Sequence, residues 1–336
     1  MVNSRKSLAV VAVALALSAV GCSGGSKSSG GADMGAKFTI AYFPTQEQPS
    51  TAAVALKNFP ALTGMTAVSV SSGPTALPLL ARGTYAALVE VAESNPILAF
   101  SQKIPVKIVW NSFQDPTILV TRQKITQPQQ LRGLRIAAPG ASAGQIFLQQ
   151  YLKTGGLTLN DIHFVNLQAS SIVAAFETKA IDGAMIWPPF ANALEAAGGQ
   201  EVVDTPSNAM ILFSTPFIKS HKDVVQGFIC GMAKTDGQFV SEPATVYSAI
   251  AKVVGEAPAA AQKNLPASFI VPPSQELSQT QLGQTDPSKP GLLSTIEVVA
   301  QSLKTAGTVS QVPTFDELKS MVDPEFAQGV ANGDCK

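Results

Sequence analysis

Strand-like and helical stretches alternate in two separate sets along this chain, and no other feature limits its fold as strongly. The first set covers residues 38–91 and the second covers residues 134–186. Such alternation is typical of parallel strands covered by helices. Two further passages, Lys107 to Arg122 and Met210 to Phe217, are predicted to cross between the sets. The sequence therefore indicates an α/β fold, and from about residue 223 it becomes helical to its end.

The length of the chain favours two lobes. About 300 residues follow residue 36, which is more than a single hydrophobic core usually spans. We predict that lobe 1 comprises residues 37–121 and 213–336, and that lobe 2 comprises residues 122–212.

The first 21 residues are predicted to be a secretory signal peptide. A basic start precedes the apolar stretch Leu8 to Val20, which is shorter than the roughly 20 residues that a membrane-spanning helix needs. The run ending at Cys22 resembles a bacterial lipobox, although Ala19 stands where leucine is preferred. Cys22 would then carry a lipid, and residues 22–36, rich in Ser and Gly, would form a flexible tether on the extracytoplasmic face of the cell membrane. The alternative is an ordinary signal peptide in which Cys22 has no role.

Charge and cysteine content bear on partners and stability. The chain has 23 Lys and Arg against 23 Asp and Glu, a balance that argues against a nucleic-acid partner. Beyond Cys22 only Cys230 and Cys335 remain, and in an oxidising exterior this pair is a candidate disulfide. The bridge would pin the C-terminal tail to a helix. The alternative is a buried free Cys230 and a frayed Cys335.

Three junctions between a strand and a helix are rich in small residues and proline, and each could hold an anion. They are Ser71 to Thr75, Glu93 to Pro96 and Pro139 to Gly144. The first N–H groups of a helix lack helical partners, and the helix dipole makes that end partly positive. The candidate ligand-binding residues in these junctions are Ser72, Thr75, Glu93, Ser94, Asn95, Ser142 and Ala143. The alternative is ordinary helix capping by the same side chains.

One further candidate is aromatic. Trp187 follows the predicted strand of residues 183–186 and precedes two prolines, which place it at a strand end. There it could form one wall of a ligand pocket, with Tyr42 and Thr45 facing it from the other lobe. The alternative is that its ring packs in the core.

The stretch Gly140 to Gly144 matches the G-x-S-x-G pattern of a hydrolase nucleophile, but the rest of such an enzyme is missing. A serine nucleophile needs a histidine base, and the chain has only His163 and His221, neither in the usual position. Two scattered histidines also make no zinc site, and no glycine-rich loop ending in lysine is present to bind ATP. We therefore expect no enzymatic activity, no metal and no cofactor.

Residues 131–190 carry a specific resemblance to a known family. The matching residues are Leu131 to Ala137, Gly140 to Ala143, Gly156 to Thr158, Asp161-Ile162, Ala174 to Phe176, Ile181 to Ala184 and Trp187. Their order and spacing resemble those of the sulfonate-, taurine- and nitrate-type solute-binding proteins of ABC importers, a family with relatives for thiamine precursors. The resemblance implies the type II periplasmic binding protein fold, in which two α/β lobes, joined by two crossing strands, close over a ligand.

The resemblance also implies a function and partners. The residues that match family ligand positions are Ser72, Thr75, Ser142, Ala143 and Trp187. The chain would capture a small anionic or zwitterionic organic solute, such as a sulfonate or taurine, and deliver it as a monomer to an ABC permease and its ATPase subunits. Around Glu93 the sequence departs from the family pattern. A carboxylate in the cleft would favour a ligand with an amine, whereas the alternative is a solvated Glu93 outside the cleft.

Two other functions stay open. One is capture of a thiamine-precursor pyrimidine, and the other is sensing or adhesion by a surface lipoprotein without transport. An enzyme of pyrimidine biosynthesis with the same fold is disfavoured, because it would lack a signal peptide and would use histidine or cysteine chemistry.

Overall fold

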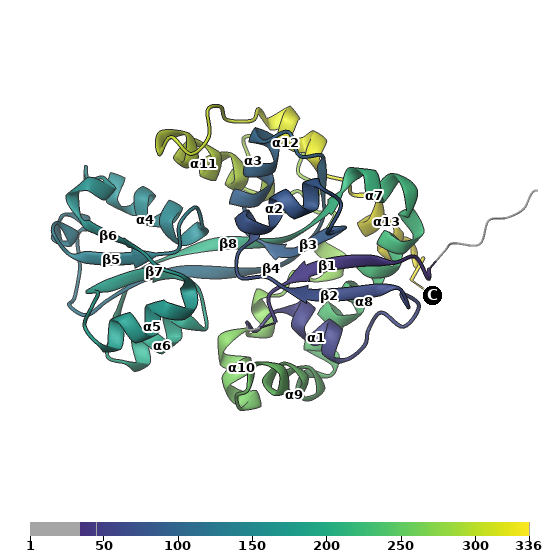
Figure 1. Ribbon diagram of the computed structural model, residues 1–336, viewed down its shortest axis with the longest axis horizontal. Coiled ribbons are helices and arrows are strands. Elements are labelled where there is room, and N and C mark those ends of the chain that lie inside the picture. Colours follow the sequence, from purple (N-terminus) through teal and green to yellow (C-terminus); the bar gives the residue numbers. More distant parts are fainter. Residues whose placement is uncertain (1–33, 45, 336) are drawn as a thin grey trace, which may run out of the picture. The chain divides into compact units, whose positions relative to one another are not determined.

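The structure is a computed structural model that describes residues 34–44 and 46–335 (Figure 1). The predicted signal peptide, the lipidation of Cys22, most of the tether and Thr45 lie outside the described residues. The described residues form one compact unit. Among the described residues, no helix combines the length and the hydropathy that crossing a membrane requires.

Eight strands form a single mixed sheet in the order β2-β1-β3-β8-β4-β7-β5-β6. The strands are β1 (Phe38–Tyr42), β2 (Met65–Ser69), β3 (Ala87–Val91), β4 (Val106–Thr121), β5 (Arg135–Ala138), β6 (His163–Asn166), β7 (Gly183–Ile186) and β8 (Gln200–Ser214). At one end β1 pairs in parallel with β2 and β3, and at the other end β5 pairs in parallel with β6 and β7. These two ends of the sheet define the first and the second lobe.

The long strands β4 and β8 connect the two lobes. They pair antiparallel from Val106 opposite Ser214 to Thr121 opposite Gln200, and each also pairs with one lobe, β8 with β3 and β4 with β7. In Figure 1 they run side by side from one lobe into the other. The expected two-lobed α/β class with two crossing strands is therefore confirmed, although the sheet is mixed where a parallel one was predicted.

The bounds predicted for the second crossing strand, Met210 to Phe217, are wrong. β8 begins at Gln200, ten residues before the predicted start, and the chain leaves it at Ser214 to form α7 (Thr215–Ser220). Its first half is polar and contains Pro206, which lies opposite Pro116 of β4. Proline cannot donate to a strand ladder, so a pattern with a central proline argues against a strand. Here the two prolines face each other, and the pairing continues on both sides.

Helices cover both faces of each lobe (Figure 1). In the first lobe α2, α3, α11 and α12 lie on one face of the sheet and α1, α8, α9 and α10 on the other, while α4 covers one face of the second lobe and α5 and α6 the other. The remaining α-helices are α1 (Pro49–Ala55), α2 (Gly73–Ala81), α3 (Ser94–Ser101), α4 (Ala143–Thr154), α5 (Ala169–Glu177), α6 (Phe190–Ala196), α8 (Lys222–Ser241), α9 (Pro243–Val254), α10 (Pro258–Asn264), α11 (Leu292–Thr305), α12 (Phe315–Met321) and α13 (Glu325–Asn332).

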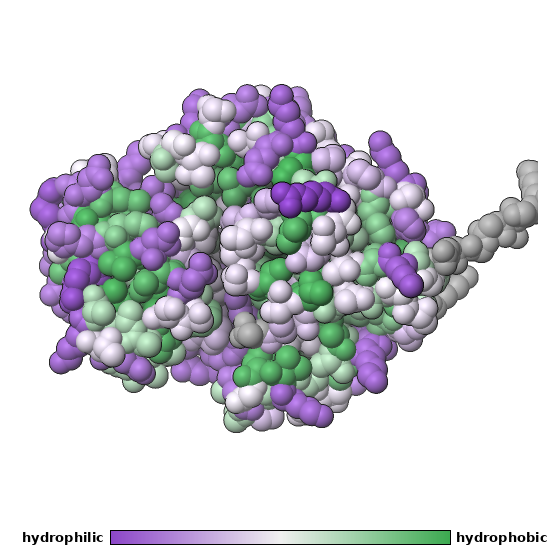
Figure 2. Space-filling model, viewed as in Figure 1, coloured by the Kyte–Doolittle hydropathy of each residue, from purple (hydrophilic) through white to green (hydrophobic). Residues whose placement is uncertain are grey.

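Each lobe buries a core against the sheet. Trp110 of β4 and Phe228 of α8 are fully buried in the first lobe, and Phe176 of α5 is fully buried in the second. Figure 2 shows hydrophobic residues dispersed among hydrophilic ones over both lobes on the face in view. The large exposed hydrophobic side chains, Val240, Val253 and Val298, stand on three different helices.

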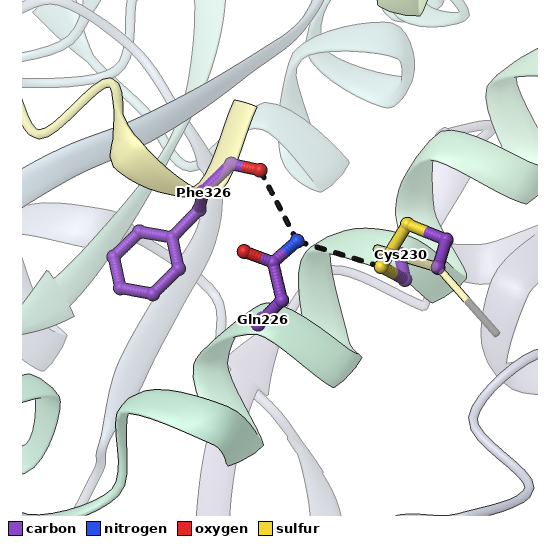
Figure 3. Close-up of a disulfide and its surroundings, with 4 residues drawn as sticks. Gln226, Cys230 and Phe326 are labelled. Atoms are coloured by element: carbon purple, nitrogen blue, oxygen red, sulfur yellow. Dashed lines mark hydrogen bonds between the residues drawn. A yellow bond between two sulfur atoms is a disulfide. The ribbon is translucent and has the colours of Figure 1, made fainter. Parts of the chain in front are cut away.

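A disulfide joins Cys230 of α8 to Cys335 near the end of the chain (Figure 3). The Cα atoms of the two cysteines lie 5.3 Å apart, and 105 positions separate them in the sequence. One turn before Cys230, Gln226 Nε2 donates a hydrogen bond to the backbone oxygen of Phe326 in α13 at 3.2 Å. The structure thus fixes the C-terminal segment to α8, as the pairing expected from the sequence requires.

Candidate functional site

A cleft between the two lobes is the candidate site. It has a volume of about 860 Å³, part of which is open to solvent. Its walls come from the segments that follow β1, β2 and β3 in the first lobe and β5, β6 and β7 in the second, and its floor comes from β4 and β8. The lining residues are Phe43, Gln46, Gln48, Ser71, Ser72, Gly73, Pro74, Glu90, Val91, Ala92, Ser94, Asn95, Phe113, Asp115, Thr117, Pro139, Gly140, Ser142, Ala143, Gln168, Ala169, Trp187, Ser207, Asn208 and Ala209. This is where open α/β sheets usually bind ligands, outside the carboxyl ends of the strands.

The structure brings most of the predicted site residues together. Those that line the cleft are Ser72, Ser94, Asn95, Ser142, Ala143 and Trp187. Tyr42 and Thr75 do not line it. Tyr42 packs partly buried against the core of the first lobe, and Thr75 is exposed, with its Oγ1 donating to the backbone oxygen of Ser72 at 2.9 Å. This hydrogen bond lies within the first turn of α2, and Thr75 does not face the cleft.

Glu93 matches neither of its two predicted positions. It is 1% exposed and lies behind the cleft wall, where its carboxylate accepts hydrogen bonds from Asn208 N at 2.6 Å, Asn208 Nδ2 at 3.0 Å and Ser207 Oγ at 3.0 Å. Burial raises the pKa of this carboxyl, and its hydrogen bonds partly oppose that shift. Glu93 therefore holds β8 against the start of α3 and presents no carboxylate to the cleft.

Three helices begin at the cleft without a side-chain cap. In α2, α3 and α4 no side chain bonds to the N–H groups of the first turn. At α4 the hydroxyl of Ser142 donates instead to the backbone oxygen of Pro139 at 2.7 Å. The first-turn N–H groups are therefore not used by side-chain caps, and ordinary capping by Ser72, Ser94 or Ser142 is not what the structure shows. In α3 the N–H of Asn95 donates to the backbone oxygen of Ala92 at 3.0 Å. Such helix ends attract negatively charged groups.

Two glycines permit these helices to begin where they do. A Cβ atom on Gly144 would lie 2.4 Å from the backbone oxygen of Met185, so only glycine lets the first turn of α4 approach β7 this closely. A Cβ atom on Gly73 would lie 2.4 Å from Asn95 Oδ1. Gly73 therefore makes room for the Asn95 side chain at the start of α2.

Acidic side chains dominate the charge of the cleft. Glu90 and Asp115 are its only charged lining residues among those that the structure describes, with Glu93 directly behind the wall. Glu90 accepts hydrogen bonds from Ser50 N at 2.8 Å, from Ser50 Oγ and from Ser112 Oγ at 2.9 Å, and burial raises its pKa to about 7. Burial, together with the nearby charge of Glu93, raises the pKa of Asp115 to about 8.

The backbone at Glu90 has an uncommon conformation. Its φ is 59°, in the left-handed region that residues other than glycine rarely adopt. The register between β3 and β8 shifts at this point, between Leu88 and Val91. Ala141, in the loop before α4, has a φ of 54°. Two of the positive-φ residues thus lie at the cleft, where such conformations often accompany function.

Four buried polar atoms of lining residues have no hydrogen-bond partner among the described residues. They are Gln48 Oε1, Ser94 Oγ, Asn95 Oδ1 and Thr117 Oγ1. A buried polar atom without a partner costs free energy, so native proteins usually satisfy such atoms. Their gathering at one cleft, from both the first lobe and the floor, points to a polar ligand that satisfies several of them together.

Sequence reasoning missed the floor of the cleft. Phe113, Asp115 and Thr117 line it at alternate positions of β4, as the period of a strand requires. The signal was a carboxylate and a hydroxyl two residues apart in a predicted crossing strand. This signal is not sufficient, because the sequence alone does not say which side of the strand faces a cavity.

The arrangement around Ser142 is not that of a hydrolase. Its hydroxyl donates to Pro139, while His163 lies exposed on β6 and His221 stacks on Phe217 at 4.6 Å between ring centroids. Neither histidine lines the cleft. Among the described residues, no three His, Cys, Asp or Glu side chains are grouped so that they could hold a metal ion.

The raised pKa values predict that stability falls as the pH rises. An unfolded chain loses the Glu90 proton near pH 4.5, but the folded chain keeps it until about pH 7, so the folded state loses relative stability across this interval. Urea unfolding should therefore show a more stable protein at about pH 5 than at about pH 7. The Glu90→Gln variant should reduce this difference by roughly 2 to 3 kcal/mol, at about 1.4 kcal/mol per pKa unit. An unchanged pH dependence in this variant would show that Glu90 ionises normally.

Comparison with known proteins shows the family of this chain. The family model described as NMT1/THI5 like matches residues 72–244, which is more than half of the chain. The taurine-binding periplasmic protein of Escherichia coli (strain K12) is 28% identical over 217 residues, 61% of this chain and 67% of that protein. The putative aliphatic sulfonates-binding protein of the same organism is 24% identical over 199 residues, 56% of this chain and 61% of that protein. These matches thus span about two thirds or less of the relatives' own length, and both relatives are binding proteins by name.

Solved structures share the same fold. The alkanesulfonate-binding protein SsuA from Xanthomonas axonopodis pv. citri, bound to MOPS, superposes with a TM-score of 0.68 at 21% identity, covering 86% of this chain and 98% of that one. At this level of identity the likeness establishes the fold alone.

Proposed function

The chain belongs to the NMT1/THI5-like family, and from this membership and the cleft we propose that it is the extracytoplasmic solute-binding component of an ABC importer. It captures a small anionic or zwitterionic organic solute, a sulfonate or taurine-like molecule, and performs no chemistry on it. The observation that carries this proposal is the cleft itself, which is lined by both lobes and flanked by three helix starts without side-chain caps. Such starts hold sulfonate or carboxylate oxygens without a lysine or arginine.

Closure over the solute would bend the two crossing strands. β4 and β8 are the sheet elements that both lobes share, and the proposed boundaries, 37–121 with 213–336 and 122–212, assign all of β4 to lobe 1 and nearly all of β8 to lobe 2. Two polar contacts already join the lobes, Asn192 Nδ2 to Asn264 Oδ1 at 2.8 Å and Gln150 Nε2 to Ser302 Oγ at 3.0 Å. Hinge motion of this kind is the usual mode of closure in two-lobed binding proteins.

The remaining parts of the proposal concern place and partners. We propose a lipid anchor at Cys22 on the extracytoplasmic face of the cell membrane, a monomeric state, and delivery to an ABC permease with its ATPase subunits. The name of the taurine-binding periplasmic protein supports only the extracytoplasmic place in this assignment.

A second candidate ligand is an aminopyrimidine of the thiamine-precursor type. The rings of Trp187 and Phe113 line the cleft and could stack on a heterocycle, while Asp115 could accept hydrogen bonds from its amino group. Unlike a sulfonate, an aminopyrimidine places no negatively charged group at the helix starts.

A thermal-shift screen of residues 23–336 tests the proposal. The panel contains taurine, ethanesulfonate, nitrate, bicarbonate, aminopyrimidines and amino acids. A ligand at about 100 times its Kd should stabilise the protein by roughly 2.7 kcal/mol. A shift with one chemical class supports solute capture and identifies the class. A flat response to the whole panel would contradict capture of such solutes and favour a surface role in sensing or adhesion.

Ser142→Asp should weaken binding of an anionic group by at least about tenfold, because it places a second negative charge at the start of α4. Aspartate is itself a good N-cap residue, so α4 should still form. Ser142→Asn is the matched control, since asparagine is neutral and its amide can still donate to Pro139. Calorimetric titration with the best ligand of the screen measures the difference. Equal affinities for the two variants would place the anion elsewhere.

A further inference from the structure

We propose that the solute must carry a protonated amine, and that Asp115 on the floor of the cleft is its counter-ion. This inference rests on the proposed function and narrows its ligand class from sulfonates in general to amino sulfonates and similar zwitterions. It assigns a role to a residue that sequence reasoning passed over.

The charge of the cleft argues against a bare anion. Among the described lining residues no lysine, arginine or histidine is present, whereas Glu90 and Asp115 both carry carboxyl groups. Without a ligand, the pKa of about 8 keeps Asp115 largely protonated at neutral pH. A solute with only a negative charge would leave water for a site without a cation and would raise that pKa further, whereas a nearby ammonium group lowers it and leaves Asp115 ionised. An ammonium group reverses the sign of that interaction, and it is the group whose burial the carboxylates can compensate.

Of the three acids at the cleft, Asp115 is the one whose carboxyl is available to a ligand. Glu90 is 3% exposed and already accepts hydrogen bonds from Ser50 and Ser112, and Glu93 is equally occupied by Ser207 and Asn208. Asp115 lies opposite Ser207 in the β4–β8 pairing and is only partly buried. Its carboxyl accepts a hydrogen bond from its own backbone N–H and makes none to another described side chain. Its carboxylate therefore borders the cleft and is not used by the fold.

The buried atoms without partners match the donors of an ammonium group. Gln48 Oε1 and Asn95 Oδ1 are carbonyl oxygens and can only accept hydrogen bonds, and Thr117 Oγ1 lies two residues from Asp115 on the same side of β4. An ammonium group offers three N–H donors and no acceptor. A sulfonate offers only acceptors, so it could not satisfy Gln48 or Asn95.

The helix starts and the floor of the cleft would bind opposite ends of the ligand. The helix starts supply N–H donors for a negative group, and the floor supplies Asp115 and the hydroxyl oxygen of Thr117 for a positive one. A short molecule with a sulfonate or carboxylate at one end and an ammonium at the other would use both. A plain alkanesulfonate would use one and leave the other unsatisfied.

Calorimetric titration of residues 23–336 with taurine, 2-hydroxyethanesulfonate and ethanolamine tests the inference. The second compound replaces the ammonium by a hydroxyl, and the third lacks the sulfonate. Wild type should bind taurine about 10- to 100-fold more tightly than 2-hydroxyethanesulfonate, the usual range for a hydrogen-bonded charged group. Asp115→Asn should lose a similar factor for taurine and little for 2-hydroxyethanesulfonate. Asp204→Asn is the control, because Asp204 is an exposed acid on β8 that does not line the cleft.

The outcomes separate this inference from the proposed function. Equal binding of taurine and 2-hydroxyethanesulfonate, or unchanged taurine binding by Asp115→Asn, would overturn the amine requirement and leave sulfonate capture standing. Tight binding of ethanolamine that depends on Asp115, with no gain from a sulfonate, would support the role of Asp115 and remove the sulfonate from the proposed function. Absence of binding by all of these amines and sulfonates would overturn both.

Discussion

Replacing Cys230 and Cys335 together with alanine is expected to lower the free energy of unfolding by about 4 to 5 kcal/mol. The disulfide closes a loop with a sequence separation of 105, and cross-linking so long a loop removes much conformational entropy from the unfolded chain. Without the bridge, α13 is still held to α8 by the hydrogen bond between Gln226 and Phe326, so the native fold should persist at low temperature. Urea unfolding of the oxidised wild type and of the double variant measures the difference.

Reductant provides the matched control for this prediction. Wild type unfolded in excess dithiothreitol should resemble the double variant, and the double variant should not respond to dithiothreitol. Ligand affinity should stay the same in all these samples, because neither cysteine lines the cleft. A loss below about 1 kcal/mol would mean that the unfolded chain keeps enough structure around α8 to make the cross-link redundant.

The elements of the second lobe could be predicted closely from the sequence. The set of strands and helices predicted over residues 134–186 is present as β5, α4, β6, α5 and β7, and the strand predicted at residues 183–186 has those bounds as β7. In each of them local signals agree with the tertiary structure. Small residues precede the helix, and the short strands are followed at once by turn or capping residues.

β8 shows why the rest of the fold could not be predicted. Its first half, residues 200–207, is polar and includes Pro206, so its local pattern predicts a loop. It is a strand because β4 lies beside it over its whole length, and Pro116 opposite Pro206 needs no N–H partner there. Pairing between segments about 90 positions apart overrides local propensity, and a single sequence does not contain that information.

Likewise, only part of the candidate site could be predicted from the sequence. The helix starts could be found because their small residues and prolines are local signals, and Ser72, Ser142 and Trp187 do line the cleft. Glu93 could not be placed, because its position depends on hydrogen bonds to Ser207 and Asn208, more than 110 positions away. For the same reason the position of Asp115 on the floor of the cleft could not be predicted, because it depends on the pairing of β4 with β8.

Trp110→Ala should destabilise the protein by about 3 to 5 kcal/mol, the range for removing a large aromatic side chain from a core. Trp110 is fully buried in β4, and its Nε1 donates to Asp236 Oδ2 of α8 at 2.9 Å. Truncation leaves a cavity and also removes the partner of that oxygen. Burial raises the pKa of Asp236 well above its usual range, and the hydrogen bond from Trp110 opposes that shift.

Trp110→Phe separates the hydrogen bond from the packing. Phenylalanine fills most of the space but has no donor, so we expect a smaller loss of about 1 to 3 kcal/mol, the cost of an unsatisfied buried polar group. Adding Asp236→Leu to Trp110→Phe should recover part of it, because no buried carboxyl then lacks a partner. Urea unfolding of the three variants at neutral pH gives these differences. If Trp110→Phe and Trp110→Ala were equally destabilised, the hydrogen bond to Asp236 would dominate and the packing of β4 against α8 would matter little.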